Sequence, residues 1–215
     1  AKGTQKQRPA KKRTRRARAS ASEATQRATS EVAQTSMKKD PLDLRDRMYE
    51  PSLGALPREL DHREYVPVIL DQGQEGACTG FGLAAVVNFL LFHHPSNADG
   101  DEGQSVSPRM LYELAKRYDE WEGEDYEGSS IRAAMKAWNR HGVCEQKLWP
   151  NKRRSRRLTG KIQLDALRNP LGSYYRVRHL HLNHMHSALN EVGILVASAS
   201  VHRGWDDVGP DGIIP

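Results

Sequence analysis

The feature that most constrains this chain is residues 79–92, a run that is apolar on every side. A surface helix confines its large apolar side chains to one stripe, so this pattern predicts a helix buried in the centre of a domain. The preceding residues, 71–77, are rich in glycine and other turn formers. The arrangement places Cys78 at the amino-terminal end of the predicted helix.

A cysteine in that position is suited to nucleophilic chemistry, because the helix dipole and the free N–H groups favour the thiolate. A glutamine just upstream could turn its amide toward the same point. Together with the backbone N–H of Cys78 it would supply two donors to a developing oxyanion. Gln72 and Gln74 are both candidates. The alternative interpretation is that Cys78 is a small buried hydrophobic residue, as free cysteines commonly are.

Further helices and strands are predicted after this run. Ser107 and Pro108 open a helix to about Tyr118, and Ser129 or Ser130 caps another that ends at Arg140 before Gly142. Residues 185–192 suit a short helix, and strand patterns occur at 66–70, 174–182 and 194–201. Helices come first and strands later, which predicts an α+β fold.

The positive charge of the chain is concentrated at its start. Residues 1–39 contain twelve Lys or Arg against two Glu, a net +10, so the remaining residues carry −4 of the total of +6. A segment of this composition buries too little apolar surface to fold and is predicted to be a disordered tail. The sharper hypothesis is that this tail contacts nucleic acid or another polyanion.

The cysteine count favours a reducing compartment, the cytoplasm. Cys78 and Cys144 are too few for a disulfide framework, although one bond between them is compatible with the sequence. No run of about 18 apolar residues is present, so no membrane span is predicted. The amino terminus lacks the apolar stretch and cleavage site that are typical of a secretory signal. A processed precursor could have lost such a signal.

The approach to Cys78 carries a family resemblance. It contains a proline, an Asp-X-Arg triplet, a Pro-Val pair and a Gln-Gly pair, at Pro57, Asp61–Arg63, Pro67 and Val68, and Gln72 and Gly73. This stretch resembles the start of the mature domain of papain and the cathepsins. The resemblance implies a papain-like cysteine peptidase with a helical lobe around a central helix, followed by the beginning of a β-rich lobe. It also selects Gln72, rather than Gln74, as the oxyanion donor beside the nucleophile Cys78.

A second stretch resembles the substrate cleft of the same family. The motifs are a glycine before a helix, a Gly-Val turn and a Trp-Pro pair, at Gly128, Gly142 and Val143, and Trp149 and Pro150. The resemblance implies peptide or protein substrates, with Gly76, Gly128 and Ser129 as substrate-binding residues and no cofactor or metal. Three departures matter. Glu75 stands where secreted members carry a disulfide cysteine, and Thr79 replaces the usual tryptophan. The segment before Pro57 is also too short and too basic to be the usual helical inhibitory propeptide.

The general-base histidine of papain-like enzymes follows the cysteine by about 130–150 residues, which is a window that begins near residue 208. His202 comes nearest, but it directly follows the predicted strand 194–201, and the resemblance places the base after a further hairpin. We therefore expect the base beyond Pro215. The histidines at 179, 181, 184 and 186 have no cysteine or carboxylate at zinc-finger spacing, so surface or cleft-edge positions are the preferred interpretation.

The expected organisation is a disordered basic tail over residues 1–39, an extended lead-in over 40–56 and an incomplete peptidase domain over 57–215. Two functions fit it. One is hydrolysis of peptide or amide bonds through an acyl-thioester at Cys78. The other is a catalytically inactive binding or scaffold module that keeps the papain-like fold and grips a polyanion with its tail.

Overall fold

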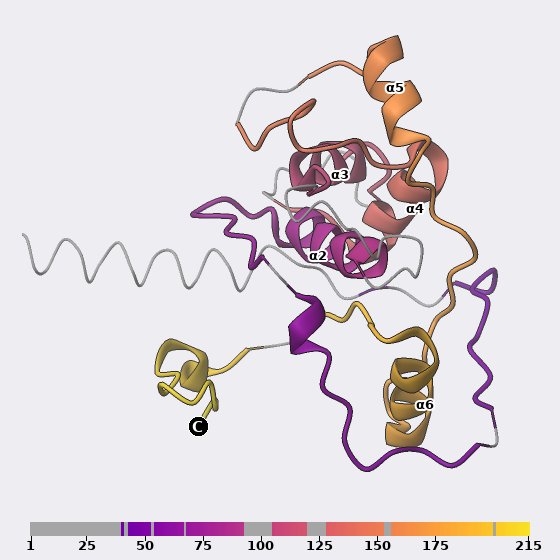
Figure 1. Ribbon diagram of the computed structural model, residues 1–215, viewed down its shortest axis with the longest axis vertical. Helices are drawn as coiled ribbons and strands as arrows, with labels where there is room; N and C mark the ends of the chain where they lie inside the picture. Colours follow the sequence, from indigo (N-terminus) through magenta and orange to yellow (C-terminus); the bar gives the residue numbers. More distant parts are fainter. Residues whose placement is uncertain are drawn as a thin grey trace, which may run out of the picture. The chain divides into compact units, whose positions relative to one another are not determined.

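The structure is a computed structural model that describes residues 40, 43–52, 54–66, 68–92, 105–119, 128–152, 156–199 and 201–215. The predicted tail, residues 1–39, lies outside this part of the chain. The α-helices are α2 (Cys78–Phe92), α3 (Pro108–Ala115), α4 (Ile131–His141), α5 (Gly160–Ala166) and α6 (Leu182–Val192), shown in Figure 1. Two 3-10 turns, η1 (Arg63–Tyr65) and η3 (Arg203–Asp206), complete the helical segments.

Helices α2, α3 and α4 pack on one another and enclose the main core (Figure 1). Apolar side chains from all three meet there, with α2 contributing Leu83, Ala84 and Val87. Phe81 and Phe89 of the same helix are also buried. The prediction of a central buried helix that begins at Cys78 is therefore confirmed.

Helix α3 lies very close to α2 at Gly80. A Cβ atom at this position would lie 2.6 Å from both the carbonyl oxygen of Pro108 and the Cβ of Tyr112. Those distances are well inside van der Waals contact and involve backbone atoms, which cannot rotate away. Only a glycine lets the two helices come this close.

The helix termini follow the residues predicted to cap them. The Ser107 hydroxyl accepts from the Met110 N–H at 3.0 Å and donates to the Trp149 carbonyl at 2.5 Å. Ser130 accepts from the Ala133 N–H at 3.0 Å, which makes it, and not Ser129, the cap of α4. Gly142 ends α4 with a φ of 67°, a conformation that favours glycine. Helix α3 ends at Ala115, three residues earlier than predicted.

A second cluster of buried side chains forms around α5, which was not predicted. It joins residues of α3, α4 and α5 to the segment between α4 and α5. Its members are Met110, Leu114, Ala137, Cys144, Trp149, Ile162 and Ala166. A helix of seven residues has little intrinsic stability, so packing of Ile162 and Ala166 holds it in place. That stabilisation is tertiary and leaves only a weak periodic pattern in the sequence.

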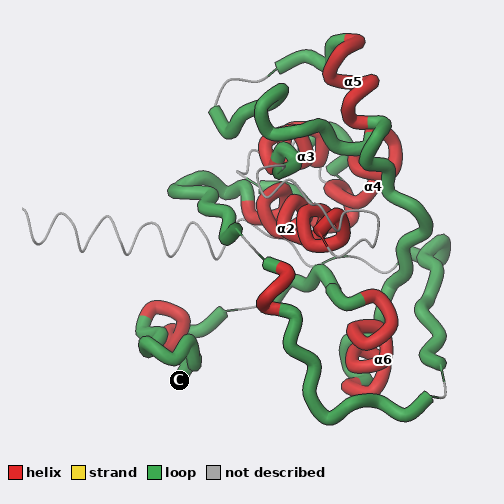
Figure 2. The backbone as a smooth tube through the Cα atoms, in the orientation of Figure 1, coloured by secondary structure: helices red, strands yellow, loops and turns green. Residues whose placement is uncertain are grey.

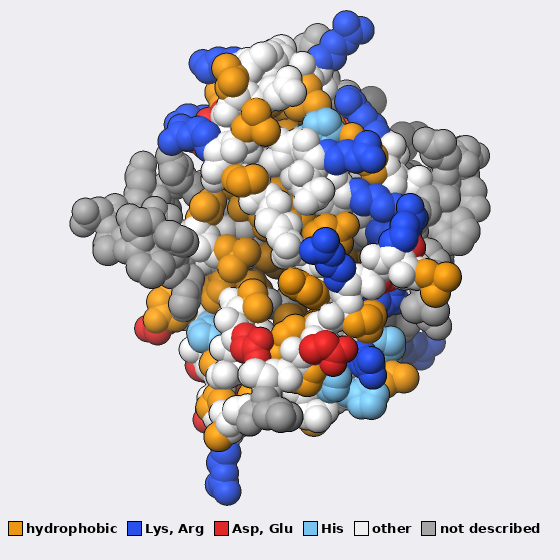
Figure 3. Space-filling model, turned by 90° about the vertical axis from the view of Figure 1, so that its right-hand side faces the viewer, with side chains coloured by type: hydrophobic (Ala, Val, Ile, Leu, Met, Phe, Trp, Pro, Cys, Tyr) orange, Lys and Arg blue, Asp and Glu red, His pale blue; other side chains and the backbone are white. Residues whose placement is uncertain are grey.

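The three predicted strands are wrong for the described residues. Residues 66, 68–70 and 194–199 form irregular segments, and within 174–182 the structure has a single parallel bridge between Met48 and Arg176 (Figure 2). A strand needs a neighbour along its whole length to bond its N–H and C=O groups, and the described part of the chain supplies none. Exposed apolar side chains remain in these segments, with Ile69 at 91% and Leu180 at 85% exposure. Figure 3 shows hydrophobic side chains reaching the surface on one face.

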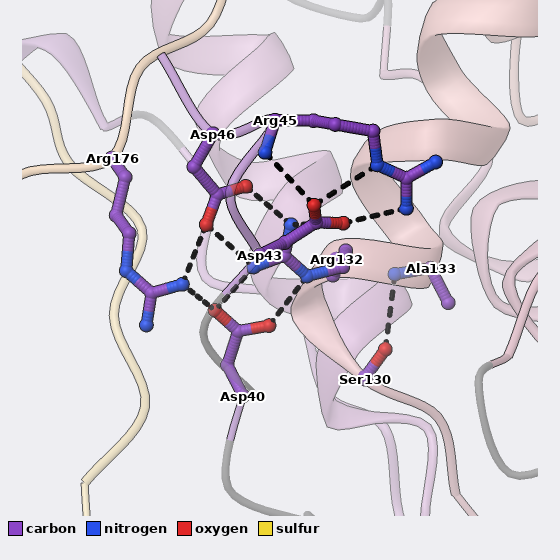
Figure 4. A network of polar contacts seen from close by, with 8 residues as sticks. All are labelled: Asp40, Asp43, Arg45, Asp46, Ser130, Arg132, Ala133 and Arg176. Carbon is purple, nitrogen blue, oxygen red and sulfur yellow. Dashed lines mark hydrogen bonds and ion pairs between the residues drawn. The ribbon is translucent and has the colours of Figure 1, made fainter. Parts of the chain in front are cut away.

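The predicted lead-in is held by arginines from distant parts of the chain (Figure 4). Arg132 of α4 contacts Asp46 and binds Asp40 at 2.8 Å. Arg176 lies 2.8 Å from the other oxygen of Asp46 and 2.7 Å from Asp40. The Arg132 and Arg176 guanidinium groups lower the pKa of Asp46 to about 2. Further along, Ser52 donates to Glu191 of α6 at 2.5 Å.

Replacement of Gly80 by alanine should lower the free energy of unfolding by about 2 to 3 kcal/mol, because the new methyl group overpacks the contact with α3. Gly82→Ala is the matched control: it lies on the same helix, is exposed and has open space around its Cβ position. There alanine should be neutral or stabilise by about 0.5 kcal/mol, since it favours the helix. Urea denaturation of both variants checks this, and equal effects at the two sites would contradict the close contact.

Replacement of Arg132 by methionine should cost about 2 kcal/mol at neutral pH, because it strands carboxylates that face the guanidinium. The pKa of Asp46 is lowered in the folded protein from 3.8 to about 2, so this stability is present above pH 3.8 and is lost as the pH falls toward 2. Denaturation at several pH values should therefore show the variant and the native chain converging on acidification. Arg45→Met, at an 85% exposed side chain, is the control and should change stability by less than about 0.5 kcal/mol.

Candidate active site

Cys78 is partly exposed at the amino-terminal end of α2, whereas the residues on either side of it are buried. Gly76 and Ala77 are buried, whereas Cys78, the first residue of the helix, is half-buried. The first helical bonds run to the Ala77 carbonyl from the N–H groups of Gly80 and Phe81, at 3.0 and 3.1 Å. Helix geometry therefore leaves the N–H groups of Cys78 and Thr79 without partners inside the helix. Free N–H groups at a helix start can donate to a negatively charged atom there.

Gln72 folds back over the segment that leads to the cysteine. Its side-chain amide donates to the Glu75 carbonyl at 3.1 Å, and the Ala77 N–H donates to the same oxygen at 2.7 Å. An amide nitrogen carries two hydrogens, so one remains for another acceptor. Gln74 is exposed. The structure thus anchors the side chain of Gln72 to the segment that precedes Cys78, and its role as oxyanion donor stays a prediction.

Glu75 is tied to α3 by an ionic contact. Its carboxylate lies 2.5 Å from Arg109, whose guanidinium also lies 2.5 Å from Glu113 one turn along the same helix. The three side chains are 16%, 4% and 10% exposed. The position at which the resemblance expects a disulfide cysteine therefore holds a carboxylate bound to a buried arginine.

The predicted cleft segment lies against the first turn of α2. The hydroxyl groups of Thr79 and Ser129 are 2.5 Å apart, and both side chains are buried. Gly128, also buried, has a φ of 151°, which favours glycine. Because the Ser129 side chain points into the protein, only its backbone groups could contact a substrate. A substrate-binding role for Gly76, Gly128 and Ser129 remains a prediction.

Several described histidines are engaged away from Cys78. His141 bonds the Tyr118 hydroxyl through Nε2 at 2.6 Å, and burial lowers its pKa. The ring of His62 packs on the edge of Phe89, and His202 accepts from the Gly204 N–H. Among the described residues the Cys78 thiol has no hydrogen bond to a histidine. In the part of the chain that the structure describes, no three or more His, Cys, Asp or Glu side chains form a group that could hold a metal ion.

The two cysteines have opposite environments. Cys144 is fully buried, and burial raises the pKa of its thiol to about 12. Cys78 is half-buried at a helix start, and both thiols are free. Cys144 is therefore a packed thiol of the second buried cluster.

Sequence reasoning missed the residues that support the site. Arg109 and Glu113 are four apart on a predicted helix, the spacing of a helical ion pair, which was a usable signal for their contact. Nothing in the sequence connects Arg109 to Glu75, or Thr79 to Ser129, because 34 and 50 residues separate the partners.

The structure is similar to solved cysteine proteases. Xylellain, a cysteine protease from Xylella fastidiosa, matches with a TM-score of 0.59 and 24% identity over 73% of this chain and 62% of its own. Digestive procathepsin L 3 of the Tenebrio molitor larval midgut matches with a TM-score of 0.55 and 20% identity, over 76% of this chain and 49% of its own. No family model matches the chain, and no curated protein matches its sequence.

The chain therefore has a papain-like fold and spans about half to three fifths of the length of these two structures. The α2–α4 region described above fits the helical lobe of that fold. No helix among the described residues is long and apolar enough to cross a membrane.

Alkylation near neutral pH should label Cys78 at least tenfold faster than Cys144. The reason is exposure together with the raised pKa of the buried thiol, which leaves it almost wholly protonated. Peptide mapping by mass spectrometry after brief iodoacetamide treatment measures the two rates. In denaturant the rates should become similar, and preferential labelling of Cys144 in the folded protein would contradict the site.

Proposed function

We propose that this protein hydrolyses peptide or amide bonds with Cys78 as nucleophile. The observation that supports this most directly is the position of a half-buried cysteine as the first residue of the central helix in a papain-like fold. Both similar structures are proteases. The substrate is a peptide or an unfolded protein segment.

In the first step the Cys78 thiolate attacks the carbonyl carbon, and the π electron pair moves to the oxygen. The Cys78 N–H and the free amide hydrogen of Gln72 stabilise that oxyanion. As the carbonyl re-forms, the C–N bond breaks and the amine leaves with a proton, which produces the acyl-thioester. Water then attacks the thioester, and the thiolate is released.

The leaving amine needs a proton donor, and the attacking water needs a base. The order of residues in the papain family places this histidine, and the asparagine that orients it, beyond Pro215. His62, His141 and His202 each contact groups other than Cys78. We propose that Cys78, Gln72 and the cleft residues act with a base contributed by the following sequence.

A second candidate is a binding or scaffold module without catalysis. It is favoured by Thr79, which stands where the family carries tryptophan and which bonds to Ser129 inside the protein. In this hypothesis residues 1–39 hold a polyanion such as nucleic acid, through the counterion release expected of twelve basic side chains. For either function we propose a cytoplasmic location, which suits two free thiols.

Gln72→Ala should lower the turnover of a peptide amide by about 10² to 10³, the scale for one oxyanion donor. The assay uses a protein that continues beyond Pro215, with Cys78→Ser as the inactive reference. Gln74→Ala is the matched control, because it removes the same kind of side-chain amide. Gln74 lies two residues after Gln72, and its side chain is exposed. Loss of turnover in the Gln74 variant instead would reassign the donor. A Cys78→Ser protein as active as the native one would favour the binding module.

A further inference from the structure

Glu75 is a junction between α3 and the segment that carries the predicted oxyanion donor. Its side chain binds Arg109, while its backbone carbonyl accepts from the Gln72 amide at 3.1 Å and from the Ala77 N–H at 2.7 Å. One residue therefore connects the arginine, the glutamine and the residue just before Cys78. If Glu75 moved, both acceptor contacts would move with it.

Arg109 is a rigid anchor for this junction. Its side chain is 4% exposed, and the guanidinium reaches Glu75 with Nη1 and Glu113 with Nη2, each at 2.5 Å. Two carboxylates held by one planar guanidinium fix its orientation as well as its charge. Because a buried charge is costly to leave unpaired, Glu75 is held strongly in this position.

The anchor itself is tied to the helix that carries the nucleophile. Arg109 lies within the turn of α3, between Pro108 and Tyr112, that makes the close contact with Gly80. Gly80 is two residues after Cys78. Arg109 is therefore linked to Cys78 in two ways. One runs along α3 to its contact with Gly80, and the other runs through Glu75 to the N–H of Ala77, the residue before Cys78.

We propose that Arg109 is a positioning residue for the oxyanion site. Acting through Glu75, it holds the Gln72 amide and the backbone before Cys78 in the arrangement that receives a developing oxyanion. An ionic contact thus secures the segment at the residue where the resemblance expects a disulfide. The inference rests on the proposed function, since it needs Cys78 to attack a carbonyl.

The test compares two reactions of the Cys78 thiol in the 215-residue chain. Iodoacetamide alkylates sulfur by displacing iodide, so no oxyanion forms. A short N-acetylated peptide aldehyde adds reversibly: sulfur bonds to the carbonyl carbon, the π pair moves to oxygen, and solvent supplies a proton. Protection of Cys78 from iodoacetamide by increasing aldehyde yields both the alkylation rate and the aldehyde dissociation constant.

Arg109→Met should raise the aldehyde dissociation constant about tenfold to a hundredfold, the scale of a displaced catalytic group, and leave the alkylation rate within about twofold. Arg109→Lys keeps a charge but loses the two-pronged contact, so it should fall between. Glu113→Gln is the matched control, because it alters the same guanidinium on the side away from Glu75, and it should stay near the native value.

If Arg109→Met does not fold, Glu75→Gln replaces it, since Arg109 then keeps Glu113 as its partner; the same rise in dissociation constant is expected. An unchanged dissociation constant in a folded variant, or equal losses in alkylation and aldehyde addition, would overturn the role of Arg109. A native protein whose Cys78 is not protected by the aldehyde would overturn the proposed function itself. The two failures are therefore distinct.

Discussion

The contact between α2 and α3 at Gly80 is the constraint on which the rest of the structure depends. The missing side chain lets the backbone of α3 lie against α2 two residues after Cys78. Once α3 is held there, Ser107 at its start reaches the Trp149 carbonyl, and its apolar residues enter both buried clusters. The orientation of the cysteine, the second core and the short helix α5 all follow from this one approach.

Polar contacts inside the protein connect segments that are far apart in the chain. The Thr79–Ser129 hydroxyl pair joins α2 to the segment before α4, and Arg109 joins α3 to the approach to Cys78. Arg132 plays the same part for the lead-in. Such contacts add little net stability, since desolvation offsets their attraction, but breaking one partner is costly. Their effect is to select one register among the packings that apolar contacts alone would allow.

These contacts also separate what the described residues supply from what catalysis still requires. A half-buried thiol at a helix start, backbone donors and an anchored glutamine need only the helical region around α2. Proton transfer needs a general base, and in the proposed function residues after Pro215 supply it. The two candidate functions share the first set of features and differ in the second, so the presence of a general base is what distinguishes them.

The sequence by itself determined the central helix, its start at Cys78 and the caps at Ser107 and Gly142, because helix signals are local and lie within a few residues of one another. The structure then chose Ser130 over Ser129 as the cap of α4. The sequence also indicated the papain-like fold through the residues before Cys78. Only the tertiary structure decided that residues 68–70 and 174–182 are not strands, since pairing depends on a neighbour that no local pattern reveals. Tertiary structure likewise joined Glu75 to Arg109 and turned Ser129 inward, because partners 34 and 50 residues apart meet only when the helices pack.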